Sequence, residues 1–163
     1  MSEIKTIPII DGDIFDCDAD AILHRVNCQG VMGSGVAKQV RERYPFVYEQ
    51  YHNLYLVAKA ELKSLLGSIQ ICPKTKSYTQ NLIDNQAIVN MFAQDRYGRD
   101  KRHTDYKALQ SCLSKVNDVF GGRSIAIPYK MSCDRGGGDW NIVDKMIRDT
   151  LTNCEVTYYR YNG

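Results

Sequence analysis

Two glycine-rich segments hold the residue types that could bind a phosphorylated ligand. The first covers residues 27–37, Asn-Cys-Gln-Gly-Val-Met-Gly-Ser-Gly-Val-Ala, and the second covers residues 132–140, Ser-Cys-Asp-Arg-Gly-Gly-Gly-Asp-Trp. Glycine leaves backbone N–H groups open to an anion, and a helix start adds the positive end of its dipole. The glycine spacing matches neither the dinucleotide fingerprint nor a P-loop. Tight turns alone explain about half of Gly-x-Gly sequences, but two such segments favour a ligand with two phosphates.

Strand-like and helix-like segments alternate along the chain, and each glycine-rich segment lies between a strand and a helix. The predicted strands cover residues 4–10, 21–26, 68–72, 87–92, 124–128 and 156–161. The predicted helices cover residues 34–44, a broken stretch from 46 to 66 that Gly67 would end, and two segments beginning near Thr104 and Trp140, with Pro45 in the first turn of the second helix. This alternation predicts an α/β fold with helices on both faces of the sheet. Such sheets bind ligands where strands end.

Length and composition indicate one globular domain over residues 1–163. Of the 163 residues, 44% are hydrophobic and 25% are charged, and the formal net charge is +2. No apolar run is long enough to span a bilayer, and the first residues lack the basic-then-apolar order of a signal peptide. We therefore expect a cytoplasmic monomer that does not contact membranes.

The sequence gives little indication of a metal site or a nucleic-acid site. The six cysteines form no Cys-x-x-Cys pair, and the three histidines do not have metal-ligand spacing. We expect free, mostly buried thiols, no bound metal and no cofactor. The basic cluster Arg96, Arg99, Lys101, Arg102 and His103 is interrupted by Asp100. A solvated loop is favoured over a nucleic-acid patch at this cluster.

Five short motifs, in the same order along the chain, resemble those of macrodomains, a family that binds ADP-ribose. They are Gly12-Asp13-Ile14, His24-Arg25-Val26-Asn27, Gly33-Ser34-Gly35-Val36-Ala37, Asn90-Met91-Phe92-Ala93-Gln94, and Ile127-Pro128 followed by the glycine-rich segment that ends Gly138-Asp139-Trp140. The pattern is most similar to the branch that contains terminal ADP-ribose protein glycohydrolases and yeast-type ADP-ribose 1″-phosphatases. This resemblance implies a three-layer α/β/α fold with a mixed six-strand sheet and an ADP-ribose cleft.

The resemblance also implies ligand contacts at particular positions. Asp13 would accept a hydrogen bond from the adenine amino group beside the Ile14 backbone, and Tyr159, with Tyr161, would flank the ring. Asn27 would face the distal ribose. The remaining contacts to the diphosphate and distal ribose would come from Gly33, Ser34, Gly35, Val36, Ala37, Gln94, Ser132, Cys133, Arg135, Gly136 and Gly137. Asp13 could equally be a turn residue or a helix cap, and an aromatic residue in a final strand is more often plain packing.

Two catalytic residues of the glycohydrolases in this branch do not carry over. Their Lys aligns with Gln94 and their Asp with Gly136. Glutamine cannot serve as a nucleophile in that role. Asp134 could act as a general base or orient a water, or it could cap a backbone turn. No histidine is evidently adjacent to Cys28 or Cys133, so both are interpreted as packing residues.

The sequence therefore predicts an ADP-ribose-binding macrodomain that hydrolyses a bond at the terminal ribose without a metal. Candidate reactions are de-ADP-ribosylation and dephosphorylation of ADP-ribose 1″-phosphate. Asp134 and Asn27 would carry the chemistry, while loop amides hold the diphosphate. His103 and Asp105 could join the site under a closing lid, although helix-start polar residues are favoured there. The alternative is a non-catalytic reader of ADP-ribose or a related NAD metabolite, which the missing Lys and Asp support.

Overall fold

Six strands form one mixed sheet in a computed structural model that describes residues 6–33, 35–76, 86–95, 104–131, 133 and 138–161. The strands are β1 (Ile9–Asp11), β2 (Ala21–Asn27), β3 (Ile69–Pro73), β4 (Ala87–Gln94), β5 (Ser124–Pro128) and β6 (Glu155–Arg160). Their order across the sheet is β1-β6-β5-β2-β4-β3. The strands from β1 to β4 in that order pair in parallel, and β3 pairs with β4 in antiparallel register. The predicted mixed six-strand sheet is confirmed.

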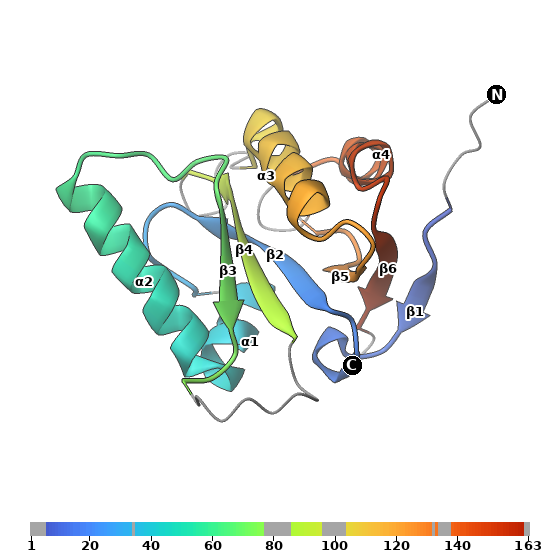
Figure 1. Ribbon diagram of the computed structural model, residues 1–163, viewed down its shortest axis with the longest axis horizontal. Helices are drawn as coiled ribbons and strands as arrows, with labels where there is room; N and C mark the ends of the chain where they lie inside the picture. Colours follow the sequence, from blue (N-terminus) through green and yellow to red (C-terminus); the bar gives the residue numbers. More distant parts are fainter. Residues whose placement is uncertain are drawn as a thin grey trace.

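Helices cover both faces of this sheet (Figure 1). The helices are α1 (Gly35–Arg43), α2 (Pro45–Ala60), α3 (Tyr106–Val119) and α4 (Trp140–Thr150), with a short 3-10 turn η1 (Ile14–Asp16) after β1. Helices α1 and α2 lie on one side of the sheet, and α3 and α4 lie on the other. The α/β/α layering is therefore as expected. None of these helices is both long and apolar enough to cross a membrane, within the residues that the structure describes.

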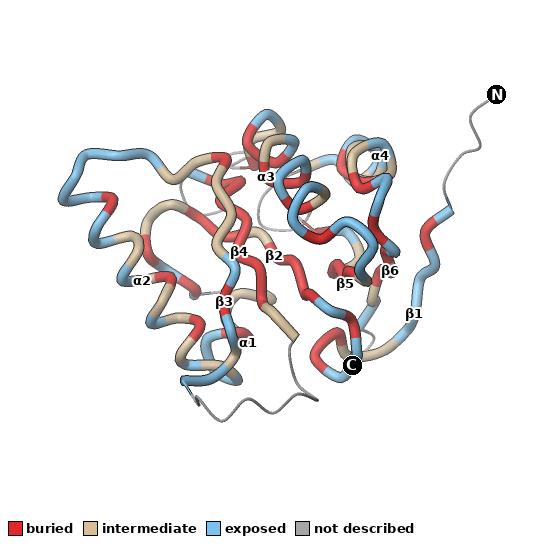
Figure 2. The backbone as a smooth tube through the Cα atoms, in the orientation of Figure 1, coloured by how far each residue is buried: buried red, intermediate tan, exposed pale blue. Residues whose placement is uncertain are grey.

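Each helical layer buries its own apolar core against the sheet. One core joins Val40 of α1 and Val47 of α2 to the side chains on one face of β2 and β4, including Ile22 and Phe92. The other core joins α3 and α4 to the opposite face. Figure 2 shows this arrangement as buried residues along β2, β4 and β5 and exposed residues on the outer sides of the helices. The six cysteines are all free, as expected.

Three predicted element boundaries are wrong. The sequence predicts a strand over residues 4–10, but among the described residues the strand covers only Ile9–Asp11. Pro8, just before it, has no N–H to donate to a neighbouring strand. The Pro8 carbonyl still accepts from the backbone N–H of Tyr158 at 2.9 Å. Asp105, not Thr104, caps α3, accepting from the backbone N–H of Ala108 at 3.0 Å. The interpretation of Asp105 as a polar residue at the start of a helix is thus confirmed.

The third wrong boundary is the end of α2, which lies at Ala60 rather than near Gly67. Leu62 takes the left-handed conformation that usually belongs to glycine, with φ of 56°. The backbone N–H of Lys63 then donates to the Ala58 carbonyl at 2.9 Å, which closes the helix. Gly67 instead ties the following turn to α3, since its carbonyl accepts from Ser111 Oγ and Lys115 Nζ.

A chain of side-chain hydrogen bonds crosses the sheet beneath α2 and determines which ring nitrogen of His24 carries its proton. Asn90 on β4 donates to Gln70 Oε1 on β3 at 3.0 Å, so its oxygen accepts from His24 Nε2 on β2. Gln70 in turn donates to the backbone carbonyl of Gln50 in α2 at 3.0 Å. The other ring nitrogen, Nδ1, is buried with no hydrogen-bond partner among the described residues. A proton added there would be buried without an acceptor.

His24 is therefore expected to make folding sensitive to mild acid. Burial lowers the pKa of His24 to about 4. As the pH falls from about 6.5 toward 4, the unfolded chain takes up a proton that the folded chain resists, so stability is lost in this window. Between about pH 7 and pH 5, urea unfolding should show a loss of ~2 kcal/mol from this residue.

Two variants separate this contribution from that of other groups. His24→Gln should reduce the drop in unfolding free energy between these two pH values, whatever its cost at neutral pH. His52→Gln, which changes a half-buried histidine on α2, is the matched control and should retain the drop. The same pH dependence in wild type and His24→Gln would contradict the prediction.

Candidate functional site

The two central strands β2 and β5 separate near their carboxyl ends. They pair only at Ala21 with Ile125 and Ile22 with Ala126, whereas β2 stays paired with β4 as far as Asn27 and Gln94. The first glycine-rich segment follows β2, and the second follows β5. Both segments therefore leave the sheet at the same edge, on either side of a gap in strand pairing. Open α/β sheets bind ligands at this kind of position.

A cavity of about 380 Å³ opens at this edge of the sheet. Its lining comes from residues 12–15, from Val36 and Gln39 on α1, and from residues 128–130 and 159–161 at the ends of β5 and β6. The structure thus brings together four residues predicted to bind the ligand: Asp13, Ile14, Val36 and Tyr159. Tyr161, expected near the adenine, also lines this cavity.

The Asp13 carboxylate at the cavity wall already has two partners. Its Oδ1 accepts from the backbone N–H of Phe15 at 2.9 Å, which caps η1, and its Oδ2 accepts from Arg43 Nη2 at 2.9 Å. The Arg43 guanidinium also lies over the Phe15 ring, 4.8 Å from its centroid. The cap interpretation of Asp13 is confirmed, and its contact with adenine stays a prediction. Arg43 was missed in the sequence, because nothing in its spacing links it to a residue thirty positions earlier.

The first glycine-rich loop is held by the side chain of Asn27. Its Oδ1 accepts from the backbone N–H of Gln29 and from Tyr51 Oη, and its Nδ2 donates to the Val31 carbonyl at 2.8 Å. This amide therefore faces its own loop and α2, and it is only 8% exposed. Its predicted role at the distal ribose remains a prediction. Tyr51 is a second supporting residue that the sequence did not single out.

Glycine is favoured at two positions of this loop for different reasons. Gly30 has φ of 75°, and a Cβ there would lie 2.5 Å from the Tyr55 ring, so no larger residue fits. Gly35 has φ of 61° and begins α1, and a Cβ there would meet none of the described residues within 4 Å. The described residues thus leave open the space beside the first residue of α1, and an anion site at a helix start needs such space. Gly33 has ordinary φ, Val36 and Ala37 pack partly into the core, and Ser34 lies outside the described residues.

Little of the second glycine-rich loop belongs to the described part of the chain. The predicted residues Ser132, Asp134, Arg135, Gly136 and Gly137 lie outside it, as does His103. Cys133 is half-buried, and its thiol contacts the Met131 carbonyl at 3.3 Å. Gln94 is buried at the end of β4, opposite Asn27 in the strand register.

The two loop thiols have the properties of packing residues rather than nucleophiles. Burial raises the pKa of Cys28 to about 12, with a further contribution from Asp95. Burial and the nearby Asp139 raise the pKa of Cys133 to about 11. Both cysteines therefore stay protonated at neutral pH, and a thiol is a poor nucleophile in that state.

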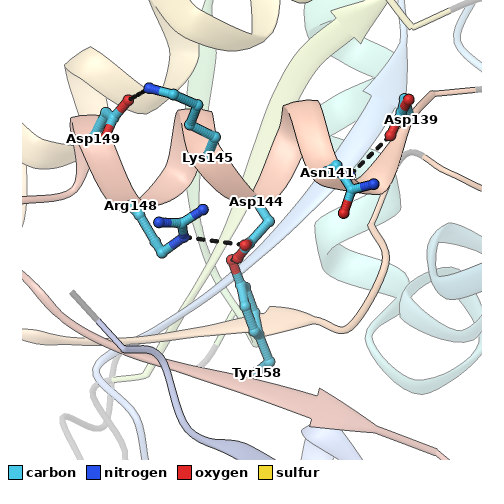
Figure 3. Close-up of polar contacts among 7 residues, drawn as sticks. All are labelled: Asp139, Asn141, Asp144, Lys145, Arg148, Asp149 and Tyr158. Carbon is cyan, nitrogen blue, oxygen red and sulfur yellow. Dashed lines mark hydrogen bonds and ion pairs between the residues drawn. The ribbon is translucent and has the colours of Figure 1, made fainter. Parts of the chain in front are cut away.

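The end of the second loop is anchored to α3 and α4. Asp139 caps α4 by accepting from the backbone N–H of Asn141 at 2.9 Å, and its own N–H donates to Tyr106 Oη on α3 at 2.9 Å. Asp144 then ties α4 to β6, because it accepts from Tyr158 Oη at 2.7 Å and from Arg148 Nε at 3.0 Å (Figure 3). The start of α4 is thereby placed at the edge of the sheet where the cavity opens.

No protein-family model matches the chain, but several curated proteins are similar to it. The DNA ADP-ribosyl transferase-DNA ADP-ribosyl glycohydrolase fusion protein of Thermosipho africanus is 25% identical over 169 residues, which cover 96% of this chain and 42% of that protein. The DNA ADP-ribosyl glycohydrolase of Mycobacterium tuberculosis is 26% identical over 136 residues, covering 83% and 36%. The ADP-ribose 1″-phosphate phosphatase of Aspergillus clavatus is 32% identical over 102 residues, covering 57% and 49%. The chain thus spans less than half the length of these three relatives.

Solved structures match over nearly the whole chain. The macrodomain of Mycobacterium tuberculosis DarG superposes with a TM-score of 0.72 at 21% identity, covering 94% of this chain and 98% of that one. Thermosipho africanus DarTG in complex with ADP-ribose gives a TM-score of 0.72 at 24% identity, covering 98% of this chain and 43% of that one. These superpositions, together with the mixed sheet between two helical layers, show that the chain has the macrodomain fold.

Proposed function

We propose that this protein binds ADP-ribose at the carboxyl ends of β2, β5 and β6 and hydrolyses a bond at its terminal ribose. The observation that carries the proposal is that a cavity and the start of a helix lie next to each other. A cavity with Asp13 and three tyrosines, Tyr129, Tyr159 and Tyr161, on its wall adjoins the start of α1, and Val36 belongs to both. A nucleoside and an adjoining diphosphate match these two parts in chemistry.

The adenosine half of the ligand would occupy the cavity. The adenine amino group would donate to Asp13 beside the Ile14 backbone, with Tyr159 and Tyr161 at the ring. The diphosphate would lie over Gly33–Ala37, and the distal ribose would reach the gap between β2 and β5. The residues around that ribose would be Asn27, Gln94, Ser132, Cys133 and Arg135–Gly137.

Asp13→Ala should weaken ADP-ribose binding by about ten- to a hundred-fold. Removing a charged acceptor of a hydrogen bond costs ~1.5–3 kcal/mol, which corresponds to that change in dissociation constant. Calorimetry measures it directly. Asp16→Ala, which removes an exposed carboxylate three residues away, is the control and should bind like wild type. An unchanged affinity in a folded Asp13→Ala protein would leave Asp13 with the capping role alone.

The reaction that we propose is attack of a water on the terminal ribose or on its phosphate. The two loop thiols are protonated, and Gln94 is a neutral amide, so neither supplies a nucleophile. Asp134 or a phosphate of the substrate would activate the water, and the loop amides would stabilise the developing charge. Candidate leaving groups are phosphate, an acyl carboxylate and an ADP-ribosylated macromolecule. Relatives are named for hydrolysis of ADP-ribosyl groups on DNA and of ADP-ribose 1″-phosphate.

One substrate panel tests the reaction. The purified protein is incubated with ADP-ribose 1″-phosphate, O-acyl-ADP-ribose, ADP-ribosylated protein and ADP-ribosylated DNA, and free ADP-ribose is measured by chromatography. Release from one member of the panel identifies both the activity and its leaving group. A Gly35→Glu sample serves as the control for a contaminating hydrolase, because it should lack the binding site.

A reader of ADP-ribose is the second candidate function, and Gln94 favours it. Gln94 is a buried amide, and it aligns with the catalytic Lys of the glycohydrolases that this sequence resembles. A reader would bind ADP-ribose in the calorimeter and release it from no member of the panel. Binding without turnover under these conditions would therefore favour the reader function over the hydrolase function.

A further inference from the structure

Lys130 adds a positive charge to the wall of the cavity that no described carboxylate balances. Three charged residues line this cavity: Asp13, Lys130 and Arg160. Asp13 pairs with Arg43, and Arg160 pairs with Asp11, where its Nε lies 2.6 Å from Oδ1. Lys130 forms no ion pair among the residues that the structure describes. The charge of Lys130 is therefore available to an anionic ligand.

The backbone of Lys130 takes a conformation that usually belongs to glycine. Its φ is 61°, in the left-handed region. Lys130 is the third residue of a four-residue turn at the end of β5, which Met131 closes by donating its backbone N–H to the Pro128 carbonyl at 3.0 Å. A positive φ at this position of a turn is most often supplied by glycine. Residues with a Cβ in such a conformation are concentrated at binding and catalytic sites, which points to a role for the lysine side chain.

The side chain of Lys130 lies against a ring that is itself held in place. Lys130 Nζ lies 5.8 Å from the centroid of Tyr129, which also lines the cavity. The Tyr129 ring packs edge to face on Trp140, with centroids 5.3 Å apart, and lies 6.1 Å from the Tyr158 ring. The backbone N–H of Tyr129 donates to the Tyr159 carbonyl at 2.8 Å, which continues the pairing of β5 with β6. The ammonium group of Lys130 is therefore placed by contacts to well-packed parts of the fold.

The place of Lys130 in the sheet brings it near the start of α1, where the diphosphate would bind. Lys130 follows β5, two residues before the second glycine-rich segment. Strand β5 lies next to β2, and the first glycine-rich segment follows β2. Val36, the second residue of α1, and Lys130 line the same cavity. A diphosphate at the start of α1 therefore lies within reach of Lys130.

We propose that Lys130 binds the diphosphate of ADP-ribose, so that the cleft selects a nucleoside diphosphate over a nucleoside by charge as well as by backbone N–H groups. The inference rests on the proposed function and adds one cation to a phosphate site that otherwise consists of loop amides. An ammonium group can donate three hydrogen bonds, and a hydrogen bond between oppositely charged groups is stronger than one between neutral groups. The other two charges on the cavity wall already have partners, which leaves Lys130 to balance the charge of the ligand.

Three variants and three ligands test the proposal. Lys130→Gln removes the charge and keeps a long polar side chain on the same backbone conformation, and Lys130→Arg keeps a cation. Arg123→Gln is the matched control, because it removes an exposed cation just before β5, at the opposite end of that strand. Each protein is titrated with ADP-ribose and ADP by calorimetry and with adenosine by NMR. The titrations are made at low and at high salt, since salt screens interactions between charges.

Lys130→Gln should bind ADP-ribose and ADP about three- to tenfold more weakly than the wild type, a loss between that of an exposed ion pair and that of a hydrogen bond to a charged group. Its affinity for adenosine should be unchanged, because adenosine carries no phosphate. Lys130→Arg should keep most of the wild-type affinity, and Arg123→Gln should match the wild type with all three ligands. High salt should weaken ADP-ribose binding more in the wild type than in Lys130→Gln.

A fourth variant, Lys130→Gly, separates binding from folding. It removes the charge and relieves the left-handed strain, so its thermal unfolding temperature should not fall below that of the wild type. Its affinity for ADP-ribose should nevertheless fall as in Lys130→Gln. Stability that is kept while phosphate-dependent affinity is lost would not result from a purely structural role of Lys130.

Four results would each overturn the proposal. They are an ADP-ribose affinity of Lys130→Gln equal to that of the wild type, an equal loss of affinity for adenosine, a loss in Lys130→Arg as large as in Lys130→Gln, and full ADP-ribose affinity in Lys130→Gly. A failure of the proposed function reads out separately, because the wild type would then show no ADP-ribose binding in the calorimeter.

Discussion

Gly35→Glu should abolish detectable ADP-ribose binding. A Cβ at Gly35 would meet no described residue within 4 Å, and Gly35 is the first residue of α1, where a helix has unpaired backbone N–H groups, so this is the place that the diphosphate would take. A glutamate there fills the space and puts a negative charge where the anion must approach. The φ of 61° adds a strain of ~1–2 kcal/mol for any residue with a Cβ, so the fold is weakened but not lost.

Two controls separate charge and position from strain. Gly35→Ala has the same backbone strain without the charge and should keep most of the affinity. Gly122→Glu has both strain and charge, with φ of 83° and no described residue within 4 Å of its Cβ position, but lies before β5 at the opposite end of that strand from the cavity. It should bind ADP-ribose as the wild type does. Calorimetry at matched protein concentrations, with thermal unfolding as the fold check, measures all three variants.

Normal binding by a folded Gly35→Glu protein would exclude the first loop as the anion site. The adenosine cavity would then need a different neighbour for the diphosphate, and the proposed function would lose its main support. Loss of binding in Gly122→Glu as well would show that the effect of Gly35→Glu comes from a weakened fold.

Local pattern predicted the elements that position the cleft, because their apolar spacing is set within each segment. The central strand β2 reads as one apolar run, and α1 and α4 show their buried faces at spacings of three and four. Short motifs also singled out Asp13 and Val36, and both of these residues line the cavity. What those motifs could not give is the strand order that brings Asp13 and Tyr159 to one cavity, since that order depends on contacts between distant segments.

The missed features are all contacts between distant segments or a residue in an unfavoured conformation. Arg43 reaches back to Asp13 from the last turn of α1, and Tyr106 holds Asp139 from a helix more than thirty residues earlier. Leu62 ended α2 without the glycine that usually marks such an end.

Asp134→Ala should reduce turnover by ~10²–10⁴-fold if this residue positions or deprotonates the attacking water, the usual contribution of a general acid or base. Affinity for ADP-ribose should change little or improve, since removing a carboxylate near a diphosphate relieves repulsion. The panel substrate that the wild type hydrolyses gives the rate, and calorimetry gives the affinity of the same preparation. Asp134→Asn separates the two roles of this residue, because an amide can still cap a turn but cannot take a proton. If Asp134 is the base, activity is therefore lost in both variants. If Asp134 only caps a turn, activity returns in Asp134→Asn.

Substrate-assisted hydrolysis predicts a different pattern for the same measurements. Turnover would survive Asp134→Ala and fall in Asn27→Ala, where the distal ribose would lose its positioning. Because Asn27 also holds the first loop through Val31 and Tyr51, its variant is informative only alongside its affinity for ADP-ribose. A fall in rate with unchanged affinity would place Asn27 at the ribose, whereas a fall in both would confine it to supporting the loop. Full activity in both variants would move the chemistry elsewhere in the cleft, and Gln94, buried beside Asn27 at the end of β4, would be the next residue to change.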